Sequence, residues 1–585
     1  MTIYLPPLRD IHFVIHHVLE APKQWRNLPA YADLDEDTAW QIVDQAGRFA
    51  AEVLASTNAV GDREGCTLRE GDVHTPAGFA AAYQSFVDGG WPSLMCDPAY
   101  GGQGLPKLLE ATLYEMLLAA NHAWAMYPGL LHGAYESLRQ HGSQELKERY
   151  LPQLVSGESL AAMALTEPQA GSDLGLVATR AIPLPDGSLS ITGSKIFISG
   201  GDHDMTSNVI HLVLCRLPDA PRGTKGLSLA LVPKLLPDGS RNAVSCVGLE
   251  EKMGIHGSAT CAIRYENATG WLVGDPHRGL AAMFVMMNSA RLHVALQGLG
   301  HLEASRQVAT RYAHERLQMR APARPAGAQA SAADPIAWHP AMRRTLWTLA
   351  ALTEGQRIAA YWTAMLLDEA EHHPDIERRD WASRRSALLT PVLKAFLTHH
   401  GFHGTSAALQ VLGGYGYVRE YGIEQHLRDA RITMVYEGTN EIQAIDFLMR
   451  KVLSDRGGAL QEMLSEFEAL ANQCEGDLAP LGMSLGRACA QARRGLAVVL
   501  QAGEEGGEAI LPVADDFLMG VGYTLMAWAW CRIATAARNL EDRELAAQKL
   551  TLARFGLSSL LHDGSYHWKK VRHLCSPLPW LAPEG

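Results

Sequence analysis

The sequence predicts a mainly α-helical protein with one β domain in the middle of the chain. Residues 1–162 are rich in Ala and Leu with apolar side chains at helical spacing, whereas residues 163–278 hold short alternating and β-branched runs. Helical spacing returns at residue 279 and continues to the end. We therefore expect an N-terminal helical domain (1–162), a middle β domain (163–278), a helical bundle (279–455) and an extra helical domain (456–585).

The composition is that of an ordinary globular protein. Of the 585 residues, 47% are hydrophobic and 19% are charged, which excludes a disordered chain, collagen and a coiled coil. The formal net charge of −12 gives no general attraction to nucleic acid, so we expect no nucleic-acid partner. The nine cysteines are odd in number and form no CxxC pair, so we expect no disulfide framework or zinc site, and a reducing, cytoplasmic location. Charged residues and histidines interrupt residues 1–20, which argues against a signal peptide.

Two stretches of the first segment have a clear character. Residues 110–121 have helical spacing, and residues 88–106 are too rich in Gly and Pro to form a helix. A loop of that length is often functional.

The middle segment contains four runs that predict strands. Residues 190–192 and 195–199 form two short runs joined at Gly193. Residues 209–215 form a third run, and residues 227–232 alternate in the way expected of a well-covered sheet.

The last two segments are predicted to be helical with a few breaks. A long helix over 290–316 precedes a linker-like stretch over 321–335, and glycines interrupt the pattern at 413–416. Gly503–Gly507 and Pro512 mark further loops.

The most apolar stretch, 517–531, is about 15 residues long, whereas spanning a bilayer needs about 18. Gly520 and Gly522 interrupt this run. We expect a helix buried in a bundle, with contact to a membrane surface as the weaker alternative.

Several common motifs are absent from the sequence. There is no GxGxxG, GxxxxGK[ST], HExxH or GxSxG, and no alternating βαβ pattern that builds a nucleotide-binding parallel sheet. His399 and His403 are four residues apart and could share a metal ion. No third ligand is close in sequence, so we expect no metal site.

Two segments of the β domain have the character of a ligand site. The loop over 163–173 offers the hydroxyls of Thr166 and Ser172, although its composition equally suits a surface turn. Phe197 and Ser199 are two residues apart, so they share one face of a strand and place an aromatic plane beside a hydroxyl. The alternative is an ordinary strand end.

Three more candidate residues lie in the helical bundle. Arg291 stands in an apolar helix start and needs an anionic partner, either a protein carboxylate or a phosphate. Arg316 ends a long helix, where it also suits the helix dipole. Glu437 lies between an aromatic residue and a glycine, where burial would raise its pKa. A helix start capped by Thr439 explains the same residues.

Together these segments resemble the acyl-CoA dehydrogenase flavoprotein family. The resemblance covers residues 30–455 and rests on ALTEPQAGSD, GSKIFISGG, YAHERLQMR, QVLGGYGYV and RDARITMVYEGTNEIQ, which occur in this order. Further stretches, such as EKMGIHGSATC, are similar to the larger bacterial branch, which includes long-chain fatty acyl-CoA and methylthiopropionyl-CoA dehydrogenases. The resemblance implies a helix bundle, a β-barrel or sheet, a four-helix bundle and an extra C-terminal helical domain.

The resemblance also implies FAD as cofactor and assigns roles to single residues. Glu437 matches the base that removes the α-proton of the acyl-CoA thioester, and Ala290 occupies the position where some members carry an alternative base. The cofactor contacts implied are Met163, Leu165, Thr166, Ser172, Phe197, Ser199, Arg316, Gln318, Gln410, Gly413, Gly414, Thr439 and Glu441. The substrate contacts implied are Ser172, Asn288, Arg291, Tyr436 and Gly438.

Some positions depart from the family pattern. Phe197 and Ser199 stand where most members have Trp and Thr, and both changes keep the chemical type. Asn288 replaces a common Asp, and Glu441 replaces the usual Gln. Met319-Arg320 replaces Phe-Gly beside the adenine.

The function implied is dehydrogenation of medium- or long-chain fatty acyl-CoA to trans-2-enoyl-CoA in fatty acid β-oxidation, with electrons passed to an electron-transfer flavoprotein. The alternatives are a 3-(methylthio)propionyl-CoA dehydrogenase, an acyl-CoA oxidase and a non-catalytic flavin-binding member. The implied assembly is a homodimer or a dimer of dimers, because Arg316, Gln318, Gln410 and the Gly413-Gly414 pair match residues that reach FAD across a subunit interface.

Overall fold

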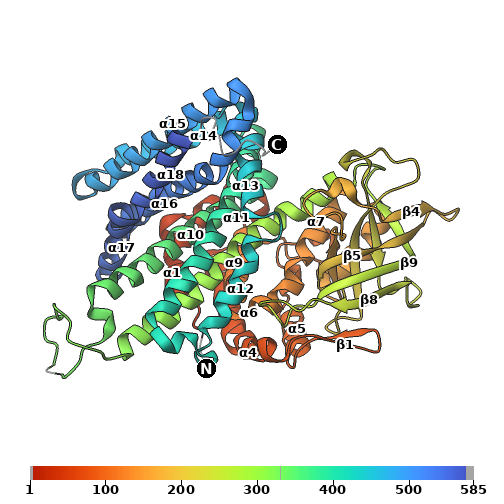
Figure 1. Ribbon diagram of the computed structural model, residues 1–585, viewed down its shortest axis with the longest axis horizontal. Helices are drawn as coiled ribbons and strands as arrows, with labels where there is room; N and C mark the ends of the chain where they lie inside the picture. Colours follow the sequence, from red (N-terminus) through yellow and green to blue (C-terminus); the bar gives the residue numbers. More distant parts are fainter. Residues whose placement is uncertain (1–3, 330, 575–585) are drawn as a thin grey trace, which may run out of the picture. The chain divides into compact units, whose positions relative to one another are not determined.

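The computed structural model describes residues 4–329 and 331–574, except for the side chains of 288–289, 505–509 and 574 (Figure 1). The chain forms two compact units. Unit 1 comprises residues 1–44, 107–115 and 294–585, and unit 2 comprises residues 45–106 and 116–293. The expected division into four domains remains a prediction.

Unit 2 contains a seven-stranded sheet, which is the predicted β domain. Its strands follow the order β3-β6-β7-β9-β5-β4, with β8 paired to β9. Only the β3–β6 pair among these is parallel. The strands are β3 (Ser159–Ala164), β4 (Arg180–Pro183), β5 (Leu189–Ser199), β6 (Asn208–Cys215), β7 (Ser228–Pro233), β8 (Val244–Leu249) and β9 (Thr260–Val273).

The sheet curls back on itself toward a barrel. Arg216, just after β6, forms an isolated bridge with Arg180 at the opposite edge strand. The Ala181 N–H donates to the Arg216 carbonyl at 2.8 Å, and the Arg216 N–H donates to the Thr179 carbonyl at 2.8 Å. Closure of this kind removes an open edge of the sheet.

The strand predictions for 209–215 and 227–232 are confirmed within about a residue, as β6 and β7. The two short runs around Gly193 form one strand, β5, rather than two. Gly193 lies inside this strand, where the lack of a side chain lets Thr179 approach: a Cβ there would lie 2.4 Å from the Thr179 hydroxyl oxygen. The register shifts between Lys195 and Ile198, where a β-bulge interrupts the ladder.

Helices of unit 2 pack against this sheet. Tyr135 and Leu138 of α7 and Leu154 of α8 belong to a buried apolar cluster that includes Leu212 and Leu229 of β6 and β7. A two-stranded ribbon, β1 (Thr67–Arg69) and β2 (Asp72–His74), lies apart from the main sheet. The helices before the sheet are α3 (Glu36–Arg48), α4 (Ala55–Glu64), α5 (Phe79–Asp88), α6 (Lys107–Gly129), α7 (Leu131–His141) and α8 (Gln144–Ser156).

Unit 1 is helical. Its long helices α10 and α11 pack along each other, and α12 and α13 pack on α11. The predicted break at 413–416 is a 3-10 turn, Gly413–Tyr417. The helices are α1 (Leu8–His12), α2 (Ala21–Trp25), α9 (Gly279–Glu315), α10 (Pro340–His372), α11 (Ile376–Val411), α12 (Ile423–Arg431), α13 (Asn440–Asp446), α14 (Gly458–Gln473), α15 (Ala479–Gly506), α16 (Ala514–Arg538), α17 (Arg543–Phe555) and α18 (Leu561–Leu574).

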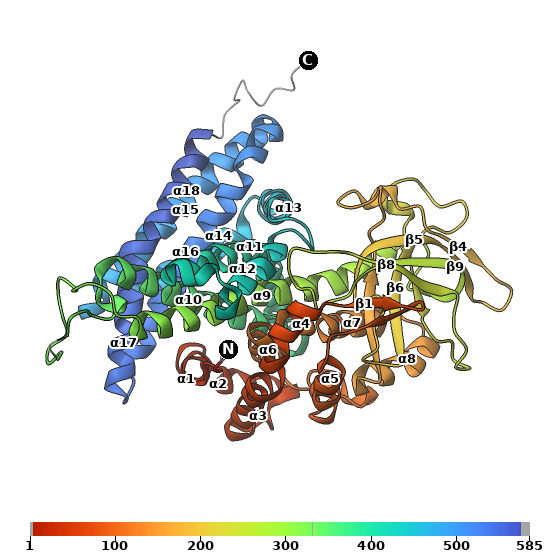
Figure 2. The same cartoon turned by 60° about the horizontal axis from the view of Figure 1, so that its bottom comes forward.

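The extra C-terminal helices gather around α16, which packs against α15, α17 and α18 as well as α10 and α11 (Figures 1 and 2). The expectation of a buried bundle helix is confirmed, but the argument from length was wrong, because α16 has 25 residues. Gly520 and Gly522 lie within α16 and do not interrupt it. They let Trp568 and Phe396 pack closely, since a Cβ would lie 2.6 Å and 2.2 Å from these rings.

Two described stretches, Gly279–Glu315 and Ile510–Arg538, are long and apolar enough to cross a membrane by length and composition. In the second, 83% of the apolar window is buried inside the protein, as is common for the core helix of a bundle.

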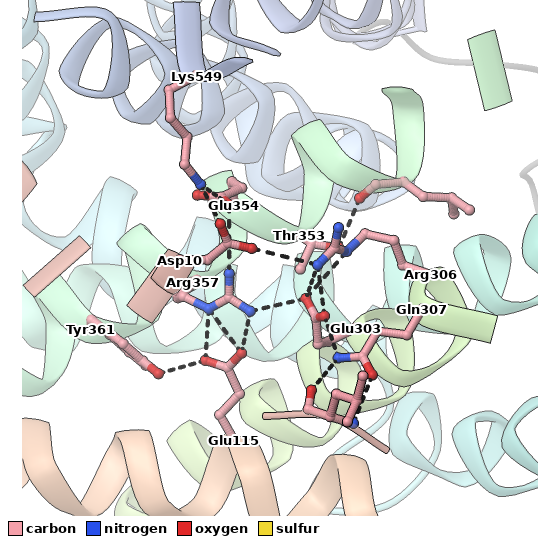
Figure 3. Close-up of polar contacts among 12 residues, drawn as sticks. Asp10, Glu115, Glu303, Arg306, Gln307, Thr353, Glu354, Arg357, Tyr361 and Lys549 are labelled. Carbon is pink, nitrogen blue, oxygen red and sulfur yellow. Dashed lines mark hydrogen bonds and ion pairs between the residues drawn. The ribbon is translucent and has the colours of Figure 1, made fainter. Parts of the chain in front are cut away.

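A buried ionic cluster ties α17 to the rest of unit 1 (Figure 3). The Lys549 ammonium binds both Glu354 of α10 and Asp10 of α1, the latter at 2.7 Å. Arg357, fully buried, binds Glu115 at 2.6 Å and Glu303 at 3.0 Å. Among the described residues, this cluster contains four carboxylates and three cations. The carboxylates are those of Asp10, Glu115, Glu303 and Glu354, and the cations are those of Arg306, Arg357 and Lys549.

Candidate active site

Glu437 has a backbone conformation that is rare for its residue type. Its φ is +56°, and that of the next residue, Gly438, is +82°. A left-handed conformation costs a non-glycine residue free energy, and such strain persists only where the surroundings impose it. The side chain is half-buried. Strain of this kind concentrates at functional sites, which agrees with the prediction that Glu437 is the base.

Residues 436–438 form a turn that is bound by three buried side chains, each from a different helix: Gln297, Gln443 and Lys394. The Tyr436 hydroxyl donates to Gln297 Oε1 of α9 at 2.5 Å. The Gln443 Nε2 of α13 donates to the Glu437 carbonyl at 2.9 Å.

The third is Lys394 of α11, whose Nζ donates to the Gly438 carbonyl at 2.8 Å. Sequence reasoning missed all three side chains. The signal for Lys394 was present: it is the one charged residue in the apolar run 388–397, where a buried cation needs polar partners.

The residues after the base begin a helix, as the alternative interpretation of this motif predicted. Thr439 caps α13, with its hydroxyl accepting from the Ile442 N–H at 3.4 Å. Hydrogen bonds from its own backbone N–H and from Thr439 lower the pKa of Glu441. Burial and the charge of Glu437 raise the pKa of Tyr436 well above its usual value. The helix start and the strained Glu437 are therefore both present.

A pocket of about 470 Å³ lies at the C-terminal end of α9 and the glycine-rich turn after α11. Its lining includes the residues predicted to reach FAD across a subunit interface: Arg316, Gln318, Gln410, Gly413 and Gly414.

The chemistry of this pocket fits an anionic, aromatic ligand such as part of FAD. The Arg316 guanidinium lies 5.6 Å from the centre of the Tyr415 ring. A Cβ on Gly413 or Gly414 would meet no atom within 4 Å, so the missing side chains leave open space beside the cation. Arginine is well suited to phosphate, and an aromatic face to a planar ring.

In unit 2 the predicted flavin loop is bonded to strand β5. The Ile196 N–H donates to the Thr166 carbonyl at 2.9 Å. The buried Lys195 Nζ donates to the Leu165 carbonyl and to Glu167 Oε1, both at 2.8 Å. Thr166 itself is half-buried, whereas Leu165 is buried. This loop is therefore held in place on both sides of Thr166.

Glu167 is the anchor of that loop. Its carboxylate also accepts hydrogen bonds from the Ala178 and Thr179 N–H groups and from the Thr179 hydroxyl. Burial opposes ionisation, but the charge of Lys195 and these hydrogen bonds prevail and lower its pKa to about 2. Sequence reasoning named neither Lys195 nor Glu167 as a site residue.

Phe197 follows directly after this anchored segment. It has a φ of +59° and an exposed fraction of 58%, both unusual for a large aromatic residue. The bulge in β5 produces this geometry, with Ile198 buried between Phe197 and the half-buried Ser199. The ring and the hydroxyl are thus both accessible, as expected for residues on one face.

Three more of the predicted contact residues, Met163, Ser172 and Arg291, lie in unit 2. Met163 is half-buried at the end of β3, and Ser172 is exposed in the loop that follows. Arg291 is half-buried in α9. The side chain of Asn288 lies outside the described part of the chain.

Each unit therefore brings together part of the predicted set. Unit 1 holds the turn at Glu437 and the Arg316 pocket, and unit 2 holds the loop over 163–172 and the residues at Phe197 and Ser199. Within residues 4–329 and 331–574, no group of three His, Cys, Asp or Glu side chains is placed to hold a metal ion. His399 and His403 pack ring to ring at 4.3 Å.

Known proteins with similar sequences span nearly the whole chain. A 3-methylmercaptopropionyl-CoA dehydrogenase of Ruegeria pomeroyi is 41% identical over 547 residues, covering 91% of each chain. A broad-specificity linear acyl-CoA dehydrogenase, FadE5, of Mycobacterium tuberculosis is 34% identical and covers 96% of each. The fold is similar to that of a Bacillus anthracis acyl-CoA dehydrogenase solved with FAD, at a TM-score of 0.75 and 21% identity, covering 94% of this chain and 90% of that one.

Family models also match in sequence order along the chain. The acyl-CoA dehydrogenase N-terminal domain matches residues 36–158, the middle domain 162–268 and the C-terminal domain 277–452. A model described as acetyl-CoA dehydrogenase C-terminal like matches residues 458–578, which are the extra helices. The chain belongs to the acyl-CoA dehydrogenase family, a family of FAD-binding oxidoreductases.

Proposed function

We propose that the protein is an FAD-dependent acyl-CoA dehydrogenase that converts a saturated acyl-CoA thioester to its trans-2-enoyl-CoA, with Glu437 as the base. The observation that carries this proposal is the strained, half-buried Glu437 inside the family's YEG motif, with its turn bonded to α9, α11 and α13. A carboxylate held in this way is suited to accept a proton from a bound substrate.

The reaction breaks two C–H bonds. The proton on the α-carbon passes to the Glu437 carboxylate, and the electron pair that it leaves forms the new double bond. When bound, FAD would supply the acceptor for the hydride that leaves the β-carbon. The backbone N–H of Glu437 donates to the thioester oxygen, which stabilises the developing enolate charge.

Residues of unit 2 are proposed to orient the cofactor. Phe197 offers an aromatic plane and Ser199 a hydroxyl, while the loop anchored by Lys195 and Glu167 presents Thr166. The Arg316 pocket is proposed to bind FAD of a second copy, which implies a dimer. Electrons are proposed to pass to an electron-transfer flavoprotein in the cytoplasm.

The acyl group is proposed to be 3-(methylthio)propionyl, because the Ruegeria relative of that activity is 41% identical over 91% of both chains. A second candidate is a medium- or long-chain linear acyl group, supported by the mycobacterial relative that covers 96% of both chains. A thioether acyl chain differs from a linear one mainly by a polarizable sulfur in place of a methylene.

Anaerobic flavin reduction across a panel of acyl-CoA thioesters tests both levels of the proposal. The panel runs from butyryl-CoA to palmitoyl-CoA and includes 3-(methylthio)propionyl-CoA. Rapid bleaching by at least one thioester, with slow reoxidation in air, supports a dehydrogenase. Fast reoxidation in air indicates the oxidase, and no bleaching by any thioester indicates a non-catalytic member. The thioester with the highest kcat/KM decides the acyl group.

A further inference from the structure

The turn at 436–438 is held by side chains that take no part in the proposed transfer of the proton or the hydride. We propose that Gln443 and Lys394 are positioning residues that fix the backbone of Glu437, and through it the place of the carboxylate. This inference rests on the proposed function, in which Glu437 is the base. Neither side chain is assigned a role by the motif that identifies the base.

The Gln443 amide imposes the conformation of the turn from one side. Gln443 is fully buried, and its Nε2 donates to the Glu437 carbonyl at 2.9 Å. A Cβ on Gly438 would lie 2.7 Å from the same nitrogen. Only a glycine at 438 therefore lets the amide approach the carbonyl of the preceding residue. The hydrogen bond from Gln443 to the turn therefore depends on the glycine of the motif.

Lys394 binds the turn from the other side. Its Nζ donates to the Gly438 carbonyl at 2.8 Å and to Asn440 Oδ1 at 3.0 Å. The Asn440 amide in turn donates to the Ala395 carbonyl of α11 at 3.2 Å. The ammonium and Asn440 thus connect the start of α13 to α11 through buried hydrogen bonds.

Two consecutive carbonyls, those of Glu437 and Gly438, are fixed by these donors. The two restrained peptide planes lie on either side of Gly438, so these bonds hold its φ of +82° and the plane that follows Glu437. Together with Tyr436, which is bound to Gln297 on the other side of Glu437, they confine the φ of +56° at Glu437. A change in that angle moves the Glu437 carboxylate and its N–H together, away from the α-proton and the thioester oxygen. A displacement of about 1 Å in such a site can lower a rate about 10²-fold.

The test compares Gln443→Met with a matched control, Gln356→Met. Gln356 is also fully buried in unit 1, and its side-chain nitrogen and oxygen make no hydrogen bond to described residues. Both exchanges keep length and remove an amide. The measurements are FAD content, the thermal midpoint, and the limiting rate and apparent Kd from anaerobic stopped-flow reduction by the best thioester of the panel.

For Gln443→Met we expect a limiting rate about 10- to 100-fold lower, with the apparent Kd and FAD content within about two-fold of wild type. Gln356→Met is expected to keep the wild-type rate. Lys394→Met is a second, independent test, for which we also expect a lower limiting rate with nearly unchanged apparent Kd and FAD content. This variant tests the inference if Gln443→Met does not fold.

A limiting rate within two-fold of wild type in both Gln443→Met and Lys394→Met would overturn the inference, as would a loss that appears only in Kd or FAD content. These outcomes are distinct from failure of the proposed function, because in that case the wild-type protein itself is not bleached by any thioester.

Discussion

Lys195 and Glu167 form a buried ion pair, Nζ to Oε1 at 2.8 Å, that anchors the loop carrying Thr166 to strand β5. Both side chains are almost completely buried, and Lys195 also binds the Leu165 carbonyl. The pair is therefore a structural support for the predicted flavin loop rather than a surface contact.

Breaking this pair is expected to destabilise unit 2 and loosen the loop. Lys195→Met leaves the Glu167 carboxylate buried without its cation, which typically costs about 3–5 kcal/mol. The double variant Lys195→Met/Glu167→Gln removes both charges and is expected to recover part of that loss. Urea unfolding followed by circular dichroism, with FAD content measured in parallel, checks both expectations.

The matched control is Arg264→Met, which removes an exposed cation 3.8 Å from Glu266 on the same sheet. Exposed pairs contribute about 0–1 kcal/mol, so stability should hardly change. If Lys195→Met were as stable as this control, the anchoring role would be wrong.

Arg316→Ala is expected to weaken FAD retention. The guanidinium lines the 470 Å³ pocket, and a charge-assisted contact to a phosphate is worth about 1.5–3 kcal/mol. The variant should lose FAD on dilution and gel filtration, measured from the flavin-to-protein absorbance ratio. Arg343→Ala, an exposed position in α10, serves as the control. Equal FAD retention in the two variants would contradict the assignment of this pocket.

Glu354 is expected to make stability depend on pH. Burial and the charge of Asp10 raise its pKa from 4.5 to about 7, against the opposing effect of Lys549. The folded state then binds more protons than the unfolded state between pH 4.5 and 7. The free energy of unfolding due to this group therefore falls as pH rises, by up to about 1.4 kcal/mol per pH unit.

Glu354→Gln keeps the side chain's shape but cannot ionise, so unfolding of the variant should depend less steeply on pH over this interval. It should be at least as stable as wild type at pH 8. Chemical denaturation from pH 4.5 to 8 measures the difference, with the exposed Glu462→Gln as control. A variant with the wild-type slope would show that Glu354 does not hold the proton.

The tight packing of α16 is tested by comparing Gly522, which lies in α16, with Gly486, which lies in α15. A Cβ at Gly522 would lie 2.2 Å from the Phe396 ring, so Gly522→Ala should cost about 1–3 kcal/mol. Gly486→Ala in α15 meets no atom within 4 Å and should gain up to about 1 kcal/mol from helix propensity. Thermal midpoints that shift in opposite directions support a buried α16. Shifts of the same sign and size would contradict the packing of α16 in the helical block.

Periodicity and glycine-rich breaks are local signals, and they predicted the order of helices and strands. The site residues came from the family resemblance, and their roles stay predictions. The β-bulge at Phe197 and the positive φ of Glu437 could not be predicted from the sequence, since both depend on tertiary hydrogen bonds. The length of α16 was underestimated because glycines in a helix were interpreted as breaks rather than as close contacts with Trp568 and Phe396. The partners of Lys394, the Gly438 carbonyl and Asn440 at the start of α13, are 44 and 46 residues away, and no local pattern indicates them.

The central claim is that Glu437 removes the α-proton, and Glu437→Gln tests it most directly. The amide keeps the size and polarity of the side chain but cannot accept the proton, so we expect normal FAD content and thioester binding with flavin bleaching slower by about 10²–10⁴-fold under anaerobic conditions. Glu424→Gln in α12 is the control and should bleach at the wild-type rate. If Glu437→Gln bleaches within a few-fold of wild type, Glu437 is not the base and the account is contradicted.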